Sequence, residues 1–314
     1  MSILVYTETE NGKFKKNAFE AVSYAKVIAD ETGDTVTALA IDPSDASQLY
    51  KYGANKVLVA KGDAHKISPE VLGKFIGENA DGNIIVLAHS SEGASIAPFL
   101  AYNLDAGLIT NAFEAPKSLS PLKVNRKSFS GKGIMLAETS AEKKVITIAA
   151  NSFGLKVNTV EGSTEDISLD ASGGRITVES VETNSGKLDL KEADIVVSAG
   201  RGMKAAENWG MIEELADLLG AATACSKPVS DMGWRPHSEH VGQTGKAIAP
   251  NLYIAVGISG AIQHLAGVNS SKNIVVINND AEAPFFKSAD YGIVGDAFEV
   301  LPKLIEAVKN YKNS

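Results

Sequence analysis

The chain has 314 residues, of which 44% are hydrophobic and 22% are charged, and its formal net charge at pH 7 is −8. Its length exceeds the ~100–200 residues of one typical domain, so two domains are expected. The acidic balance argues against a broad basic surface for nucleic acid. A single cysteine excludes an internal disulfide framework, and no apolar stretch approaches the ~20 residues that a membrane-spanning helix needs.

The first hundred residues alternate between strand patterns and helix patterns. Short apolar runs predict strands at 3–6, 35–41, 56–60 and 84–88. Apolar residues at helical spacing predict helices at 17–31, 46–52, 69–79 and 92–104. Strands such as NKVLVA and NIIVLA are apolar throughout, which is typical of a parallel sheet with helices on both faces.

The pattern changes between residues 106 and 188. Stronger alternation and turn residues there predict mixed or antiparallel strands that extend the first sheet. A further strand is predicted at 175–182, and a linker is predicted near 183–189, after a polar stretch rich in Gly and Ser. We therefore expect an α/β protein with an N-terminal domain at 1–188 and a C-terminal domain at 189–314, each a mostly parallel sheet flanked by helices.

Three strand ends in the second domain carry small or polar residues, at 200–202, 257–260 and 278–280. An amphipathic helix is predicted up to 219 and a last helix at about 300–309. Ligands of open parallel sheets bind outside the carboxyl ends of the strands, so these three points could line one crevice. The spacing GISGAIQHLAG differs from the GxGxxG dinucleotide fingerprint, and glycines that only serve tight turns remain an alternative.

The particular residues are more specific than their spacing. LYIAVGISGAIQHLAG, with VGQTGK before it and VVINND after it, closely resembles the signature of the electron transfer flavoprotein alpha subunit. The resemblance continues through SAGRGM at 198–203 and ADYGIVGD at 289–296, whereas the first half, which opens with ILVYTE, matches more loosely. It implies a Rossmann-like C-terminal domain that binds FAD and an N-terminal domain that packs against a homologous beta subunit.

The resemblance also implies an electron carrier that turns over no substrate of its own. Electrons would come from dehydrogenases such as acyl-CoA dehydrogenases and pass to an acceptor such as a quinone oxidoreductase. The first strand pattern begins at residue 3 without a basic leader. We therefore expect a cytoplasmic bacterial protein, or a mitochondrial matrix protein whose leader has been removed.

By the same resemblance, a set of C-terminal residues would bind FAD: Gly200, Arg201, Gly202, Ser226, Lys227, Gln243, Thr244, Gly257, Ser259, Gly260, Gln263, His264, Asn278 and Asp296. Thr244 would hydrogen-bond flavin N5, and Gln243 would contact the ring or its ribityl chain. His264 would lie beside the flavin C2 carbonyl, where a donor or an imidazolium stabilises negative charge. From the residues alone, a turn-stabilising threonine and a packed helical histidine are the alternatives.

The other end of the cofactor would meet a second group of residues. Ser259 and the amides of 257–260 would contact the diphosphate or the ribityl hydroxyls, and Asn278 and Asp296 would hold the adenosine end. For Asp296, a helix N-cap explains the residue nearly as well.

Lys227 departs from the family pattern, which normally has Ser-Arg where this chain has Ser226 and Lys227. Arg offers a planar fork that stacks on a ring, whereas Lys offers a point charge. We therefore expect a lower flavin potential than in relatives with Arg. Arg201 would reach the flavin edge or the diphosphate, although a surface ion pair with Glu207 is an equal alternative.

Other readings remain open from the sequence alone. An electron-bifurcating flavoprotein subunit shares the same signature, and an NAD(P)-binding oxidoreductase subunit shares the same fold. HSSEGASIAP at 89–98 resembles a phosphate-cradling turn, as in a nucleotide sensor, but a helix cap is favoured there. Cys225 is expected to be a buried, inert thiol, and His237 and His240 are expected to lie in a solvated loop rather than to bind metal.

Overall fold

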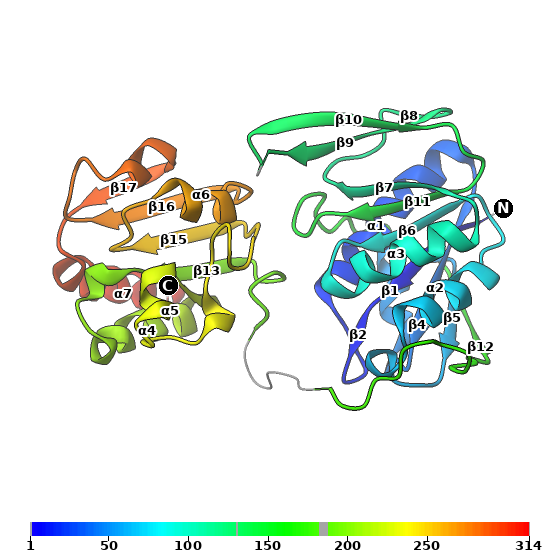
Figure 1. Cartoon of the computed structure of the whole chain (residues 1–314), viewed down its shortest axis with the longest axis horizontal. Helices are drawn as coiled ribbons and strands as arrows, with labels where there is room; N and C mark the ends of the chain where they lie inside the picture. Colours follow the sequence, from blue (N-terminus) through cyan, green and yellow to red (C-terminus); the bar gives the residue numbers. More distant parts are fainter. Residues whose placement is uncertain (1, 130, 182–187, 314) are drawn as a thin grey trace. The chain divides into compact units, whose positions relative to one another are not determined.

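The structure is a computed structural model that describes residues 2–129, 131–181 and 188–313. The chain divides into two compact units, Met1–Ser128 with Gly133–Thr183 and Phe129–Lys132 with Asn184–Ser314. Each unit has a parallel-rich sheet with helices packed on it, which confirms the expected α/β class (Figure 1). The domain boundary between 188 and 189 stays a prediction, and most of the predicted linker at 183–189 lies outside the described residues.

The sheet of the first unit has the order β10-β9-β7-β11-β6-β1-β4-β5-β12 within the described part of the chain. Pairing is parallel from β7 to β12 and antiparallel at β9 and β10, as expected for the extension after residue 106. The parallel strands are β1 (Ser2–Thr7), β4 (Thr35–Ile41), β5 (Lys56–Ala60), β6 (Ile84–Ala88), β7 (Gly107–Ala112), β11 (Lys144–Ile148) and β12 (Ser163–Ile167). The antiparallel strands are β8 (Ser118–Leu119), β9 (Leu122–Ser128) and β10 (Gly133–Thr139).

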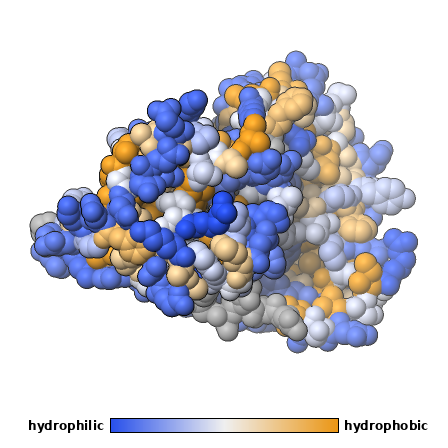
Figure 2. Space-filling view, turned by 60° about the vertical axis from the view of Figure 1, so that its left-hand side comes forward, coloured by the Kyte–Doolittle hydropathy of each residue, from blue (hydrophilic) through white to orange (hydrophobic). Residues whose placement is uncertain are grey.

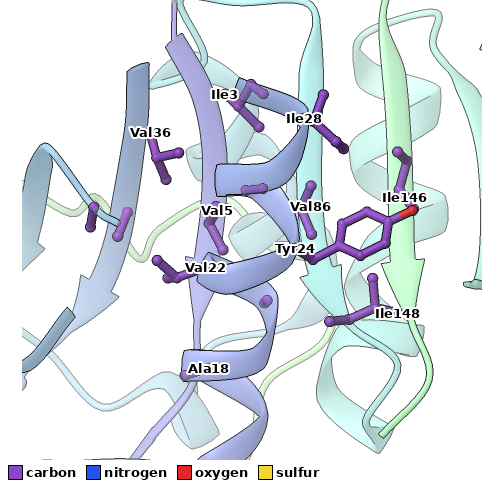
Figure 3. Packing of buried hydrophobic residues seen from close by; sticks show 14 of the residues in the cluster. Ile3, Val5, Ala18, Val22, Tyr24, Ile28, Val36, Val86, Ile146 and Ile148 are labelled. Carbon is purple, nitrogen blue, oxygen red and sulfur yellow. The ribbon is translucent and has the colours of Figure 1, made fainter. Parts of the chain in front are cut away.

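Helices cover both faces of this sheet because alternate strand residues face opposite sides. Ile3 and Val5 of β1 pack in one core cluster with α1 (Lys16–Thr32), and Leu4 and Tyr6 pack in the other with α2 (Pro69–Glu78) and α3 (Ser91–Asn103). Figure 3 shows α1 packed on the face of the sheet, roughly along the strand direction, with the Tyr24 ring directed toward β11. The unit also contains the 3₁₀ turns η1 (Ala46–Tyr52) and η2 (Ala64–Lys66) and the small hairpin of β2 (Thr9–Glu10) and β3 (Lys13–Phe14).

One local prediction for the first unit was wrong. Residues 175–181 form no strand, and residue 182 lies outside the described part. The sheet edge beside β5 is instead taken by β12, which pairs in parallel from Ser163 opposite Lys56 to Ile167 opposite Ala60. The helix predicted at 46–52 is present with these bounds as a 3₁₀ helix, closed at Gly53 in the left-handed region.

The second unit has an all-parallel sheet in the order β14-β13-β15-β16-β17. Helices α4 and α7 share one core cluster, and Val268 of α6 and Phe285 of η6 lie in the other. The strands are β13 (Ile195–Ala199), β14 (Ala222–Cys225), β15 (Leu252–Val256), β16 (Asn273–Asn278) and β17 (Tyr291–Val294). The helices are η3 (Arg201–Met203), η4 (Ala206–Trp209), α4 (Gly210–Leu219), α5 (Lys227–Asp231), η5 (His237–Glu239), α6 (Ile262–Val268), η6 (Pro284–Ser288) and α7 (Ala297–Asn313).

The surface shown in Figure 2 is mostly hydrophilic, as the charged content of 22% leads one to expect. Hydrophobic residues lie scattered among the hydrophilic ones on this face. Among the described residues, no helix is both long enough and apolar enough to cross a bilayer.

Glu20 on α1 is a buried carboxylate that fixes the loop after β11. Its oxygens accept hydrogen bonds from the backbone N–H groups of Asn151 (2.9 Å), Phe153 (2.8 Å) and Gly154 (2.8 Å). Glu20 itself is 2% exposed, so water does not compete for these bonds. The carboxylate therefore ties the loop to the helix that covers the sheet.

We expect Glu20→Ala to lower the free energy of unfolding of the first unit by about 3 kcal/mol, because one buried and two partly buried N–H groups lose a charged acceptor. Both tryptophans, Trp209 and Trp234, lie in the second unit. In urea, the far-UV circular dichroism transition should therefore shift while the tryptophan fluorescence transition does not. Glu31→Ala, at an exposed position of the same helix, is the control, and equal shifts for the two variants would contradict the role of Glu20.

Candidate functional site

The carboxyl ends of β13, β15 and β16 surround a cavity of about 570 Å³ in the second unit. This is the edge at which open parallel sheets bind their ligands. The cavity is lined by Arg201, Gly202, Ser226, Lys227, Pro228, His240, Val241, Gly242, Gln243, Thr244, Gly257, Ile258, Ser259, Ala261, Gln263, His264, Asn278, Asp280 and Ala283. Most of the residues that the sequence singled out therefore lie together.

Two glycine turns form the floor of the site by direct contact between their backbones. The N–H of Gly202 donates to the carbonyl of Gly257 over 3.1 Å. A Cβ atom added to Gly202 would lie 2.6 Å from the Gly257 Cα, and Gly257 itself has a φ of 60°. A Cβ atom on Gly200 would lie 2.3 Å from the Gly257 carbonyl oxygen. Only glycine fits at these positions, because any side chain would force the two turns apart.

The loop Val241–Lys246 forms a second wall of the cavity. Its shape is fixed by backbone hydrogen bonds from Gln243 N–H to the Gln263 carbonyl (2.7 Å) and from Gly242 N–H to the Lys246 carbonyl (3.2 Å). The side chains of Gln243 and Thr244 are exposed and line the cavity, so their polar atoms are available to a bound molecule. The first of these bonds also joins the loop to α6, which carries His264.

His264 is a buried imidazole at the start of α6, with 7% of its surface exposed. Its Nε2 lies 2.8 Å from the hydroxyl of Tyr253 on β15, and the ring also hydrogen-bonds the backbone of Val241. Burial, followed by the nearby His240, lowers the pKa of His264 to about 4. The ring is therefore neutral at physiological pH, and its orientation is set by Tyr253 and by the Val241 backbone.

Buried polar groups shape the cavity near the ends of β14 and β16. Asn278 is 8% exposed, donates from Nδ2 to the Ile258 carbonyl (3.0 Å) and accepts from the Asp280 N–H (3.0 Å). Ser226 is 6% exposed, and its N–H donates to the Ala199 carbonyl over 3.1 Å. These bonds hold both residues in place at the cavity wall.

Two cations line the cavity. Lys227 starts α5, and its ammonium group donates to the Asp231 carboxylate over 3.3 Å. Arg201 is exposed at the cavity edge, and within the described residues the structure records no ion pair between it and Glu207. The site therefore presents positive charge to a ligand, opposed by Asp280 among the lining residues.

Arg235 anchors the segment that leads into this loop. Its guanidinium donates to both oxygens of Glu239 (2.7 and 2.8 Å) and to Glu213 on α4 (2.7 Å), and it lies 5.5 Å from the centre of the Trp209 ring. Paired carboxylates and guanidinium groups of this kind are rigid because two parallel bonds fix their orientation. This clamp places His240, the next residue after Glu239, at the cavity.

Not every predicted site residue reaches the cavity lining. Gly200 and Gly260 shape the turns beneath it; a Cβ atom on Gly260 would lie 2.5 Å from the Phe285 Cβ. Asp296 lies outside the lining, because its Oδ1 accepts from the Phe298 N–H (2.9 Å) and caps α7. Its other partner is Lys204, at 3.4 Å. The structure shows the helix-capping bond that the sequence left as an alternative, and a contact of Asp296 with a ligand stays a prediction.

Several lining residues were not predicted, and His240 is the most informative of them. It was expected in a solvated loop, but it is only 6% exposed and lines the cavity, whereas His237 is exposed and its Nδ1 lies 2.8 Å from the Ser230 hydroxyl. The position of His240 immediately before VGQTG was the available signal. Cys225 is buried as expected, and burial raises the pKa of its thiol to about 12.

In the first unit, the phosphate-like turn at 89–98 is closed by the chain itself. The Ser90 hydroxyl accepts from the Gly93 N–H (2.9 Å), which makes Ser90 the N-cap of α3 and confirms the favoured reading. The same hydroxyl donates to the carboxylate of Glu8, which is 2% exposed. A buried carboxylate thus already occupies the N-terminal end of this helix.

We expect Gly202→Ala to lower the free energy of unfolding of the second unit by about 2–4 kcal/mol, because its Cβ would overlap the Gly257 backbone. The matched control is Gly210→Ala. Gly210 has helical dihedral angles and no atom within 4 Å of an added Cβ, so alanine there should be neutral or slightly stabilising. Tryptophan fluorescence in urea reports the second unit, and an unshifted midpoint for Gly202→Ala would refute the packing argument.

Two family models match this chain. The electron transfer flavoprotein domain matches residues 3–178, and the electron transfer flavoprotein FAD-binding domain matches residues 189–269, which include most of the cavity lining. The similarity to known proteins extends over nearly the whole chain. An electron transfer flavoprotein subunit alpha of Syntrophomonas wolfei is 37% identical over 314 residues, which cover 97% of this chain and 98% of that protein.

Other bacterial relatives agree with this match. The subunit of the same name from Bacillus subtilis is 37% identical and covers 98% of this chain and 97% of its own length. The subunit from Pseudomonas aeruginosa is 38% identical, and the match covers 98% of this chain and 100% of that protein. These findings confirm the resemblance and establish FAD as the cofactor of the second unit. The chain therefore belongs to the electron transfer flavoprotein family, among its alpha subunits.

Proposed function

We propose that this chain carries electrons with FAD held in the cavity at the carboxyl ends of β13, β15 and β16. The observation that supports this most directly is the meeting of Gln243, Thr244, Ser259, His264 and Asn278 around one cavity. These residues come from four separate segments of the chain, and the fold brings them together. A volume of about 570 Å³ lies within the range of ordinary cofactor and ligand sites.

The residues present fit a dinucleotide. The side-chain-free backbone at Gly202 and Gly257 allows close approach of a diphosphate, and Lys227 and Arg201 supply positive charge. Thr244 and Gln243 offer adaptable hydrogen-bond donors to the ring end. Asn278, whose amide is oriented by Ile258 and Asp280, would meet the adenosine end.

FAD supplies the redox chemistry of this site, because it takes up two electrons and releases them one at a time. The chain orients the cofactor and sets the charge around it. His264 contributes a neutral, fixed dipole, since its pKa is far below physiological pH. The cations Lys227 and Arg201 favour the state in which the cofactor carries more negative charge.

In this proposal the chain pairs with an electron transfer flavoprotein beta subunit and turns over no substrate of its own. Its donors would be dehydrogenases such as acyl-CoA dehydrogenases, and its acceptor would be a quinone oxidoreductase. The three similar proteins named above are bacterial, which supports a cytoplasmic location. We propose that these redox partners dock at the exposed edge of the cavity.

Visible spectroscopy tests the proposal directly. The chain is co-purified with its beta subunit, deflavinated, and reconstituted with FAD, and flavin absorption bands that bleach on stepwise reduction are the expected result. NAD(P)H binding in place of FAD would contradict the proposal and favour an oxidoreductase subunit. Gln243→Ala with Thr244→Ala should weaken FAD binding at least about tenfold, because two polar contacts are lost.

We expect Lys227→Arg to raise the reduction potential of the bound cofactor by about 10–40 mV, because a guanidinium adds a stacking interaction of about 0.5–2 kcal/mol to the charge already present. The measurement is a redox titration against a dye of known potential. Lys204→Arg is the matched control, since Lys204 pairs with Asp296 outside the cavity lining. A potential that is unchanged or lower in Lys227→Arg would refute the role given to this position.

A further inference from the structure

His240 is a largely buried residue in the wall of the cavity. It is 6% exposed, and within the described part of the chain the structure records no hydrogen bond to either ring nitrogen. Its backbone is held on both sides, by a bond from its N–H to the His237 carbonyl (3.1 Å) and one from the Lys246 N–H to its carbonyl (2.9 Å). The ring is therefore fixed in place by the chain and presented to the cavity.

Glycines of the neighbouring loop make room for this ring. A Cβ atom on Gly245 would lie 2.8 Å from the His240 Nδ1, and one on Gly242 would lie 3.4 Å from its Nε2. Both ring nitrogens thus lie beside the loop that presents Gln243 and Thr244. Larger side chains at 242 and 245 would displace the ring.

His264, the other imidazole of the cavity, is in a different situation. It is bonded to the Tyr253 hydroxyl and to the Val241 backbone, so its protonation state is fixed by the protein. The His240 nitrogens are not sealed in the protein, so they can be reached from the cavity that the ring lines. Since no described residue is hydrogen-bonded to the His240 ring, a molecule bound in the cavity can pair with it.

The charges around His240 determine how its proton responds to a ligand. Lys227 at the start of α5 disfavours the protonated ring, as do His237 of η5 and His264 of α6, whereas Asp231 at the end of α5 favours it. Burial, followed by the charge of Lys227, lowers the pKa of His240. A diphosphate-bearing cofactor adds negative charge to the same cavity and shifts this balance toward the imidazolium.

We propose that His240 takes up a proton when FAD fills the cavity, so that the imidazolium becomes a third cation of the binding site beside Lys227 and Arg201. The proposal rests on the function proposed above, and it adds a residue and a pH dependence to that site. A proton from solvent binds to a ring nitrogen, and no bond of the cofactor is made or broken. Because binding raises the pKa of His240, FAD affinity is highest below the pKa of the FAD-free protein.

This linkage determines the direction and the size of the pH dependence of FAD binding. As the pH rises between the pKa of the FAD-free form and that of the FAD-bound form, the Kd for FAD should rise by up to about tenfold per pH unit. Above the pKa of the bound form, the Kd should become constant. Within that pH window, binding should consume up to one proton per FAD.

Calorimetry of FAD binding to the deflavinated full-length chain with its beta subunit tests the proposal. Titrations in two buffers of different ionisation enthalpy, repeated from about pH 5.5 to 8.5, give the protons taken up per FAD. We expect His240→Gln to abolish the uptake and to flatten the pH dependence, and the exposed neighbour variant His237→Gln to retain both. Unchanged proton uptake in His240→Gln, or none in the wild type, would overturn the proposal.

Two further results keep the test decisive. If His240→Gln does not fold, ¹⁵N NMR of the His240 ring in the wild-type protein, assigned through its own backbone, reports the same proton. If the His240 ring stays neutral on FAD addition from about pH 5.5 to 8.5, the proposal is wrong. Absence of FAD binding by the wild type would instead refute the function proposed above, so the two failures are distinguishable.

Discussion

The cofactor site depends on the contact between two stretches of bare backbone, at Gly202 after β13 and at Gly257 after β15. Parallel strands bring their carboxyl ends to one edge, but side chains normally keep the following turns apart. Here an added Cβ atom on either glycine would lie within 2.7 Å of the other residue's Cα atom. The absence of side chains lets the chain close beneath the cavity, and the loops that carry Thr244 and His264 are arranged around that floor.

Much of the fold could be predicted from the sequence because its strands are apolar on both faces and short. The run at 35–41 and the run at 84–88 became β4 and β6 with the expected bounds. The run at 175–181, RITVESV, alternates apolar and polar residues and forms no strand, and the sheet edge beside β5 is paired with β12. The local sequence pattern indicates the β-propensity of a segment. Whether the segment forms a strand also depends on pairing with a neighbouring strand in the folded protein.

The residues within the family signature could be predicted from the sequence. The sequence predicts less where one side chain could either contact a ligand or stabilise the fold. Asp296 could serve a ligand or a helix end, and α7 takes it as a cap. His240 was misplaced because a loop sequence does not reveal burial; the clamp between Arg235 and Glu239 and the glycines at 242 and 245 enclose it. Lys227 was placed correctly at the cavity, yet its ammonium group lies against Asp231.

The carboxylate of Glu8 has a consequence for ligand binding in the first unit. It follows β1 directly and is held against the first turn of α3 by Ser90, so it acts as a tethered anion. A tethered group competes at an effective concentration that a freely diffusing phosphate compound does not reach. Displacing it would also strand a buried charge. Phosphate compounds should therefore not bind at the N-terminus of α3.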